Sequence, residues 1–312
     1  LRTLTTGANN VAIGDQALYT TTANENTAVG KAALHYTTTG EKNTGIGAWA
    51  IYNNTIGLNN TAVGYKVMYT NTEGENNVAV GYESLYSNTT ADHNTSIGRQ
   101  TMYHNSTGTK NVAVGNNNLE QNTTGYENTA IGYNALLANT EGYYNTAVGV
   151  EALRFSTENP NNTAVGWRAL YTNTTGYSNT GIGRSALYTN GIGIENTAIG
   201  FSAMYDNSSG SKNVAVGQES LKNNETNNLV AMGFQSYYTN TTGTGGVAIG
   251  FKAMYDCTGV NNTAVGYEAL FDTSTGVDNT GVGYNALKAN TTGANNTAVG
   301  DSALVANTDA DG

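Results

Sequence analysis

The chain has 312 residues and a formal net charge of -10, with 13 Lys plus Arg against 23 Asp plus Glu. An acidic surface repels polyanions, so we expect no nucleic acid among its partners. A single cysteine excludes an internal disulfide, and no apolar run approaches the roughly 18 residues of a membrane span, so we expect no membrane insertion.

A five-residue phrase, Asn-Thr-Ala-Val-Gly at 60–64, recurs along the whole chain. We number its Asn as position 1 and its Gly as position 5, and we call all residues that share a position a row. The closing glycines follow one another in steps of 17 residues, with three steps of 16 that end at Gly30, Gly233 and Gly266. The repeat predicts 18 coils in a single uninterrupted region over residues 1–312.

Each unit holds two apolar segments of about five residues, separated by stretches rich in Gly and Asn. Neither segment is long enough for a stable helix, and β-branched residues bounded by Gly and Asn are typical of strands and turns. A strand, a corner, a second strand and a turn make one coil of a parallel β-solenoid. Such coils stack roughly 4.8 Å apart. The sequence therefore predicts an all-β solenoid in which each row becomes a line of like side chains.

Alternation along a strand puts rows 2 and 4 on one face and row 3 on the other. We expect the aliphatic rows 4 and 9 to fill the interior, since each such side chain contributes roughly 1.5–3 kcal/mol when buried. These core residues are Val29, Val63, Val80, Val114, Val148, Val165, Leu85, Leu136, Leu153, Leu170 and Leu187. The corner between strands needs glycine, for positive φ or close approach. It is assigned to Gly64, Gly81, Gly132, Gly149 and Gly166.

The remaining apolar rows predict an outer surface made of small residues in rows 3 and 8 and aromatic residues in rows 6 and 10. A lone solenoid should not expose so long an apolar stripe, so we expect copies of the chain to associate along their length. The alternative is a monomer with partly solvated tyrosine ladders. The residues assigned to this surface are Tyr52, Tyr69, Tyr86, Tyr103, Tyr171, Tyr188 and Tyr205.

The repeat is already under way at Leu1, in position 9, and still running at Gly312, in position 17. Solenoids need polar caps, because an open end exposes unpaired strand edges. We therefore expect either a slice of a longer fibre or a subunit that stacks end to end.

The phrases at 60–64, 128–132 and 196–200, followed by Ala-Leu-Tyr-Thr-Asn-Thr-Thr-Gly at 169–176, resemble known repeats. They are similar to the head repeats of YadA-type trimeric autotransporter adhesins and to the arrays of bacteriophage tail-fibre-like proteins. The resemblance implies a left-handed β-roll with three chains per fibre. It also implies an extracellular location, on a cell surface or on a virion.

Residues that could carry chemistry are scattered. His35, His93 and His104 lie on different units and are expected as solvated turn residues, and Cys257 is expected as a free thiol in a turn. No phosphate-binding loop or paired-cysteine motif occurs, and the acidic residues lack the regular Asp spacing of calcium-binding β-rolls. We expect no enzyme activity, no metal and no cofactor.

These observations predict a non-enzymatic structural or adhesive fibre segment, such as an adhesin head or a tail-fibre shaft. Its Tyr and Asn/Thr rows suit repeated weak contacts with a cell-surface glycan or protein receptor. One alternative is a self-assembling extracellular filament. Another is an ice-binding solenoid, suggested by the regular threonines of row 2. That row is expected to face inward and is interrupted by Val11, Val78, Val112 and Val214.

Overall fold

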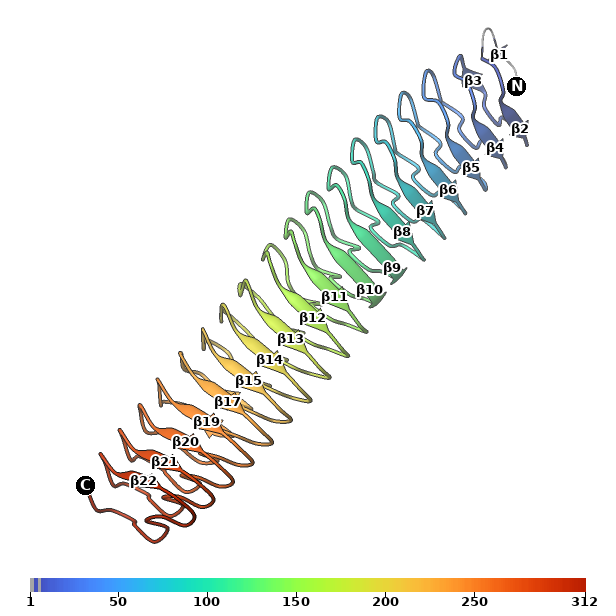
Figure 1. Ribbon diagram of the computed structural model, residues 1–312. Coiled ribbons are helices and arrows are strands. Elements are labelled where there is room, and N and C mark those ends of the chain that lie inside the picture. Colours follow the sequence, from blue (N-terminus) through green and yellow to red (C-terminus); the bar gives the residue numbers. More distant parts are fainter. Residues whose placement is uncertain (1–2, 5–6) are drawn as a thin grey trace. The chain divides into compact units, whose positions relative to one another are not determined.

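The computed structural model describes residues 3–4 and 7–312 of the chain. These residues form strands and turns, and no helix occurs among them. The chain divides into two compact units, Leu1–Pro160 and Asn161–Gly312. Each unit is a parallel β-solenoid with the 17-residue coil that the sequence predicted, and Figure 1 shows the strands of each unit stacked side by side.

Each coil contributes one short strand that begins at position 2. In the first unit these strands are β2 (Val11–Ile13), β4 (Thr27–Val29), β5 (Thr44–Ile46), β6 (Thr61–Val63), β7 (Val78–Val80), β8 (Thr95–Ile97), β9 (Val112–Asn116), β10 (Thr129–Tyr133) and β11 (Thr146–Val148). In the second unit they are β12 (Thr163–Val165), β13 (Thr180–Ile182), β14 (Thr197–Ile199), β15 (Val214–Val216), β17 (Val230–Met232), β19 (Val247–Ile249), β20 (Thr263–Val265), β21 (Thr280–Val282) and β22 (Thr297–Val299).

Neighbouring strands pair in register, so like positions lie one above another. Val63 of β6 pairs with Val80 of β7, and Val80 pairs with Ile97 of β8. Ile97 in turn pairs with Val114 of β9. The predicted columns of like side chains are therefore present in the sheet.

A second, minor set of strands occurs at positions 11 and 12. β1 (Thr3–Leu4) pairs with β3 (Thr20–Thr21) in the first unit, and β16 (Asn223–Asn224) pairs with β18 (Thr239–Asn240) in the second. Each pair includes a coil of 16 residues, in which the exposed residue at position 14 is missing.

The second apolar segment of the coil is not the five-residue strand that the sequence predicted. Its residues at positions 7 and 9 adopt left-handed backbone geometry, as at Lys66 (φ 50) and Met68 (φ 48). Even the β-branched Ile51 at position 9 has φ 47. This conformation is costly for a side chain with a branched Cβ. The segment is a series of tight turns that carries the chain back across the coil.

The interior differs from the prediction in four rows: rows 3 and 8, expected on the outer surface, are buried, and rows 2 and 4, expected inside, lie outside. The leucines of row 9, including Leu85, Leu136, Leu153, Leu170 and Leu187, are buried, together with the alanines of rows 3 and 8. The valines of row 4 lie on the outer face and are half-exposed, contrary to the expectation for Val29, Val63, Val80, Val114, Val148 and Val165. The coil is too thin for two large rows. A Cβ placed on Gly45 of row 3 would lie 3.3 Å from Cγ of Leu34.

Two rows of asparagine complete the interior. In row 1, the backbone N–H of Asn77 donates to Oδ1 of Asn60 (3.0 Å), and Nδ2 of Asn77 donates to the carbonyl oxygen of Ala91 (2.8 Å). In row 12, Nδ2 of Asn71 donates to Oδ1 of Asn54 (2.7 Å). Buried amides of this kind satisfy backbone groups that the turns would otherwise leave unpaired.

The glycines of row 5 have φ between 128 and 141 in both units. A Cβ on Gly64 would lie 2.8 Å from the carbonyl carbon of Gly81, one coil further along. The same geometry holds at Gly132, Gly149 and Gly166 (φ 141, 138 and 132). Row 5 therefore requires glycine because of the backbone angle, and the stacking of coils adds a second reason.

Candidate functional surface

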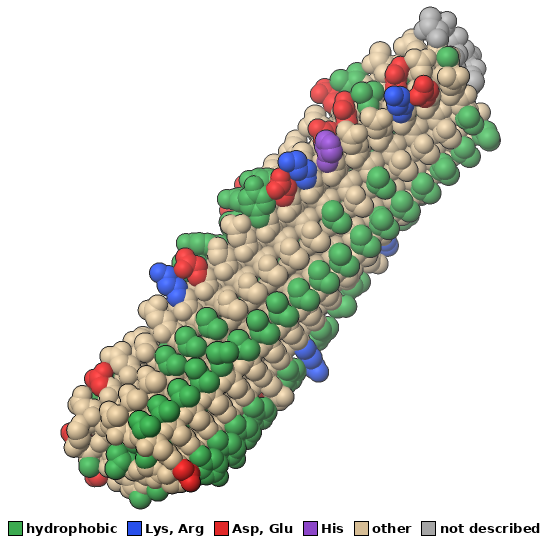
Figure 2. All heavy atoms as spheres, in the orientation of Figure 1, with side chains coloured by type: hydrophobic (Ala, Val, Ile, Leu, Met, Phe, Trp, Pro, Cys, Tyr) green, Lys and Arg blue, Asp and Glu red, His purple; other side chains and the backbone are tan. Residues whose placement is uncertain are grey.

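The outer face of the strands is an aliphatic line. Row 3 points inward, so rows 2 and 4 point outward on either side of it. Ile97, Ile131 and Ile182 of row 4 expose 38%, 40% and 38% of their surface. Figure 2 shows apolar side chains gathered in evenly spaced rows along the coils of each unit, while most charged side chains lie towards the edges of the view.

Row 2 lies beside row 4 and carries threonine in most coils. It is interrupted by Val11, Val78, Val112, Val214, Val230 and Val247. The expectation that row 2 faces inward is wrong, since its residues are half-exposed or exposed. Rows 2, 3 and 4 contain no charged residue. The strand face therefore presents hydroxyl and aliphatic groups in register and no charge.

Aromatic side chains of row 6 border this face. In the second unit, Phe234, Phe251, Tyr267 and Tyr284 stack in succession with ring centroids 5.3, 4.8 and 5.1 Å apart. Arg184 interrupts the row and lies near the rings on either side of it. The Arg184 guanidinium lies 5.1 Å from the ring of Trp167 and 5.4 Å from that of Phe201. Row 6 thus extends the apolar surface beyond the strand.

The tyrosines of row 10 form stacked, half-buried ladders. Ring centroids lie 5.0 Å apart for Tyr52–Tyr69, 5.3 Å for Tyr69–Tyr86, 4.9 Å for Tyr86–Tyr103, 5.0 Å for Tyr171–Tyr188 and 4.9 Å for Tyr188–Tyr205. Partial burial raises the pKa of the Tyr103 and Tyr205 phenols. These ladders stabilise the stack by ring contact, and they leave each ring part-exposed.

His35 belongs to the same row and differs from its prediction as a solvated turn residue. It is 6% exposed and lies between Tyr19 and Tyr52, with centroids 4.9 and 5.0 Å away. Its Nδ1 donates to the carbonyl oxygen of Gln16 (3.2 Å). His93 and His104 are exposed. The side chain of His35 is thus a ladder member that replaces a tyrosine ring.

Cys257 is a buried free thiol in row 12, where most coils carry Asn. Nδ2 of Asn262 lies 3.5 Å from its Sγ. Within residues 3–4 and 7–312, no three His, Cys, Asp or Glu side chains come together as metal ligands. Across the same residues, no helix has the length and apolarity needed to cross a membrane.

No protein-family model matches the chain, and no curated protein matches its sequence. The function is therefore inferred from the rows themselves. The outward orientation of rows 2 and 4 is the feature that the sequence interpretation missed. The sequence does indicate this orientation, because row 3 contains only Ala, Gly or Ser, as expected for residues on the narrow inner side of a coil.

Proposed function

We propose that the chain is a non-enzymatic structural or adhesive fibre segment whose copies pack side by side through the face formed by rows 2 and 4. The observation that carries this proposal is the uninterrupted, uncharged line of half-exposed to exposed Val, Ile and Met in row 4 of each unit. Soluble monomers rarely expose contiguous apolar patches of this extent.

A second copy of the chain is the partner that fits this face best. The face repeats with the period of the coils, and another copy presents the same rows with the same period. Charge favours the same choice. The chain carries a net charge of -10, so most of its surface repels a second copy, whereas rows 2 and 4 do not. Association through the uncharged face therefore has the lowest electrostatic cost.

Three copies about one axis are the arrangement we propose. Each copy would then turn its row 4 toward the axis, where three aliphatic lines exclude water together. The row 6 aromatics would flank the seam and the turns would face outward. Such a fibre, displayed outside a cell or on a virion, would offer many identical copies of any weak surface site, and their contacts would add through avidity.

The test is the mass of the protein in solution, by native mass spectrometry and light scattering. We expect a trimer for the natural sequence. The first variant carries four aspartates in row 4. It should be a monomer, and its far-ultraviolet circular dichroism should be unchanged. Its substitutions are Ile97→Asp, Ile131→Asp, Ile182→Asp and Ile199→Asp. The matched set places the same charges at exposed turn positions of row 14, in Thr90→Asp, Thr107→Asp, Thr124→Asp and Thr175→Asp, and should remain a trimer. A natural protein that stays monomeric at about 100 μM would contradict the proposal.

Ice binding is the second candidate, and the outward threonines of row 2 favour it. Hydroxyl and aliphatic groups at regular spacing on a flat, uncharged face could order a layer of water. This function needs the face open to solvent, whereas fibre association buries it. A monomer that lowers the freezing point without lowering the melting point, and loses this activity in the row 4 aspartate set, would favour ice binding over the fibre.

A further inference from the structure

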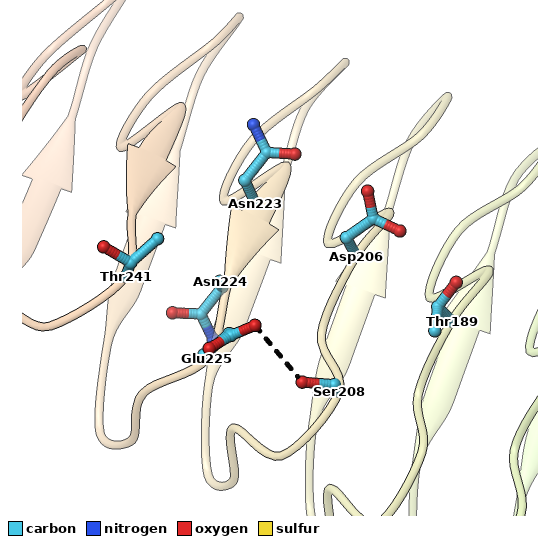
Figure 3. A pocket seen from close by; sticks show the side chains of 7 residues that line it. All are labelled: Thr189, Asp206, Ser208, Asn223, Asn224, Glu225 and Thr241. Carbon is cyan, nitrogen blue, oxygen red and sulfur yellow. Dashed lines mark hydrogen bonds between the residues drawn. The ribbon is translucent and has the colours of Figure 1, made fainter.

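The second unit contains a hollow of about 370 Å³ that is lined by polar residues of rows 11 to 13 and not by rows 2 and 4. Figure 3 shows its walls as two short rows of side chains on neighbouring coils. Row 11 contributes Thr189, Asp206 and Asn223, and row 13 contributes Ser208, Glu225 and Thr241, with Asn224 between them. The volume lies within the range of small-molecule sites.

One residue of the repeat is missing beside the hollow. The coil that ends at Gly233 has 16 residues, and its turn passes from Glu225 in position 13 to Thr226 in position 15. The exposed side chain of position 14, present as Ser209 one coil earlier and as Thr242 one coil later, is absent here. Two coils before the short coil, Gly191 occupies position 13 without a side chain.

Hydrogen bonds to the neighbouring coils hold the short coil in place. Nδ2 of Asn224 donates to Oδ1 of Asn207 (2.8 Å), which continues the buried ladder of row 12. Thr226 replaces the usual glycine, and its Oγ1 donates to the carbonyl oxygen of Gly243 (2.7 Å). Backbone bridges join Thr189 to Asp206 and Asp206 to Asn223. The recess is thus a preformed feature of the backbone.

The side chains of the walls retain unused hydrogen-bonding capacity. Within the described residues, the side chains of Thr189, Asp206, Asn223 and Thr241 make no hydrogen bond to the protein. Glu225 Oε1 accepts one long hydrogen bond from Ser208 Oγ (3.4 Å). Two carboxylates, an amide and several hydroxyl groups with unused hydrogen-bonding capacity therefore line one small space.

We propose that this hollow binds a neutral saccharide. A pyranose presents several hydroxyl donors on one ring, which match the carboxylate, amide and hydroxyl oxygens of the walls. Two carboxylates disfavour sialylated or sulfated sugars by like-charge repulsion. The site does not depend on association through rows 2 and 4.

The test uses the complete protein and ligand-observed nuclear magnetic resonance with maltotriose, cellotriose, mannotriose, lactose and sialyllactose. We expect at least one neutral sugar to bind with a Kd on the order of 1 mM, and sialyllactose to bind no better than lactose. No binding of any neutral sugar at about 10 mM would overturn the proposal. Binding of sialyllactose alone would also overturn it.

Two sets of variants test whether the sugar binds in the hollow. Asp206→Asn combined with Glu225→Gln should weaken binding about tenfold or more, whereas Asp256→Asn, in the same row 11 but outside the hollow, should not. Insertion of a threonine between Glu225 and Thr226 restores the 17-residue coil and should abolish binding. The oligomeric mass of each variant is measured in parallel. Binding that survives the insertion in a folded protein would refute the assignment, whatever the oligomeric state.

Discussion

Gly246 leaves open the space that the ring of Tyr237 occupies. A Cβ on Gly246 would lie 2.6 Å from Cε2 of Tyr237. Tyr237 stands in row 9, where other coils carry Leu, Ile or Met, and it is fully buried. Gly246 stands in row 1, where most coils carry Asn. The two departures from the repeat are therefore complementary.

Gly246→Asn, which restores the usual residue of row 1, should destabilise the protein by about 1–3 kcal/mol through overpacking. Tyr237→Leu should also destabilise it, because a cavity remains where the ring was. The double variant should lose less stability than the sum of the two single losses, with a coupling of about 0.5–3 kcal/mol. Urea unfolding of the four proteins measures the cycle, and strictly additive losses would show that the ring does not fill the glycine's space.

The columns of like residues follow directly from the fixed period, which is why the solenoid could be predicted from sequence. The orientation of rows 3 and 4 could not be predicted from hydrophobicity alone. Val63 is larger and more apolar than Ala62, so the burial argument favoured Val63 inside. The coil is too thin for this arrangement. The leucines of row 9 fill its interior and leave room only for Ala, Gly or Ser opposite them.

The turns after row 5 were also beyond sequence reasoning. Left-handed geometry at Ile51 and Met68 contradicts the local preference of these residues, and stacking with neighbouring coils supports it. His35 was predicted in a turn and lies in the tyrosine ladder. Its position 10 is a tyrosine position, which would have indicated the ladder. The position of the hollow at Glu225 is also marked in the sequence, by the 16-residue step that ends at Gly233.

Comparing Gly283 with Gly300 distinguishes the two reasons for glycine in row 5, which are the backbone angle and the close approach of the next coil. Both have left-handed φ, 138 and 128. A Cβ on Gly283 would lie 2.6 Å from the carbonyl carbon of Gly300, whereas a Cβ on Gly300 meets nothing within 4 Å. Gly300→Ala should therefore cost only the backbone strain, and Gly283→Ala should cost about 1–3 kcal/mol more. Urea unfolding and amide hydrogen exchange of the last coils measure the difference, and equal losses would mean that the stacking clash is relieved without cost.

Asn71 should stabilise the stack far more than the half-exposed Asn53 does. Its Nδ2 donates to Oδ1 of Asn54 (2.7 Å), and its Oδ1 accepts from Nδ2 of Asn88 (2.5 Å). Asn71→Ala leaves buried polar atoms without these partners and should cost about 1–3 kcal/mol. Asn53→Ala removes the same side chain from a half-exposed site and should change stability by no more than about 0.5 kcal/mol. Similar losses in both variants, measured by urea unfolding, would argue against the ladder as a source of stability.

Cys257 should make the protein less stable at alkaline pH. Burial raises the pKa of its thiol from 9.0 to about 11, and burial also raises the pKa of the neighbouring Tyr237 phenol. Below pH 9 the thiol is protonated in both the folded and unfolded chain, so its contribution to stability is fully present. Between pH 9 and about 11 only the unfolded thiol ionises, and stability falls as pH rises, by about 2–3 kcal/mol in total.

Cys257→Ala isolates this contribution, because every other ionisable side chain is unchanged. The variant loses packing at all pH values, so its unfolding free energy starts lower, but it should fall less steeply between pH 9 and 11 than that of the natural protein. Thiol labelling with a disulfide reagent at pH 8 provides an independent check. Since the folded thiol is buried and protonated, modification should wait for the coil around Cys257 to open, and its rate should rise with urea in step with unfolding. Fast labelling of the folded protein would mean that the thiol is accessible. Parallel pH profiles of unfolding free energy for the natural protein and the variant would mean that burial does not control the ionisation of the thiol.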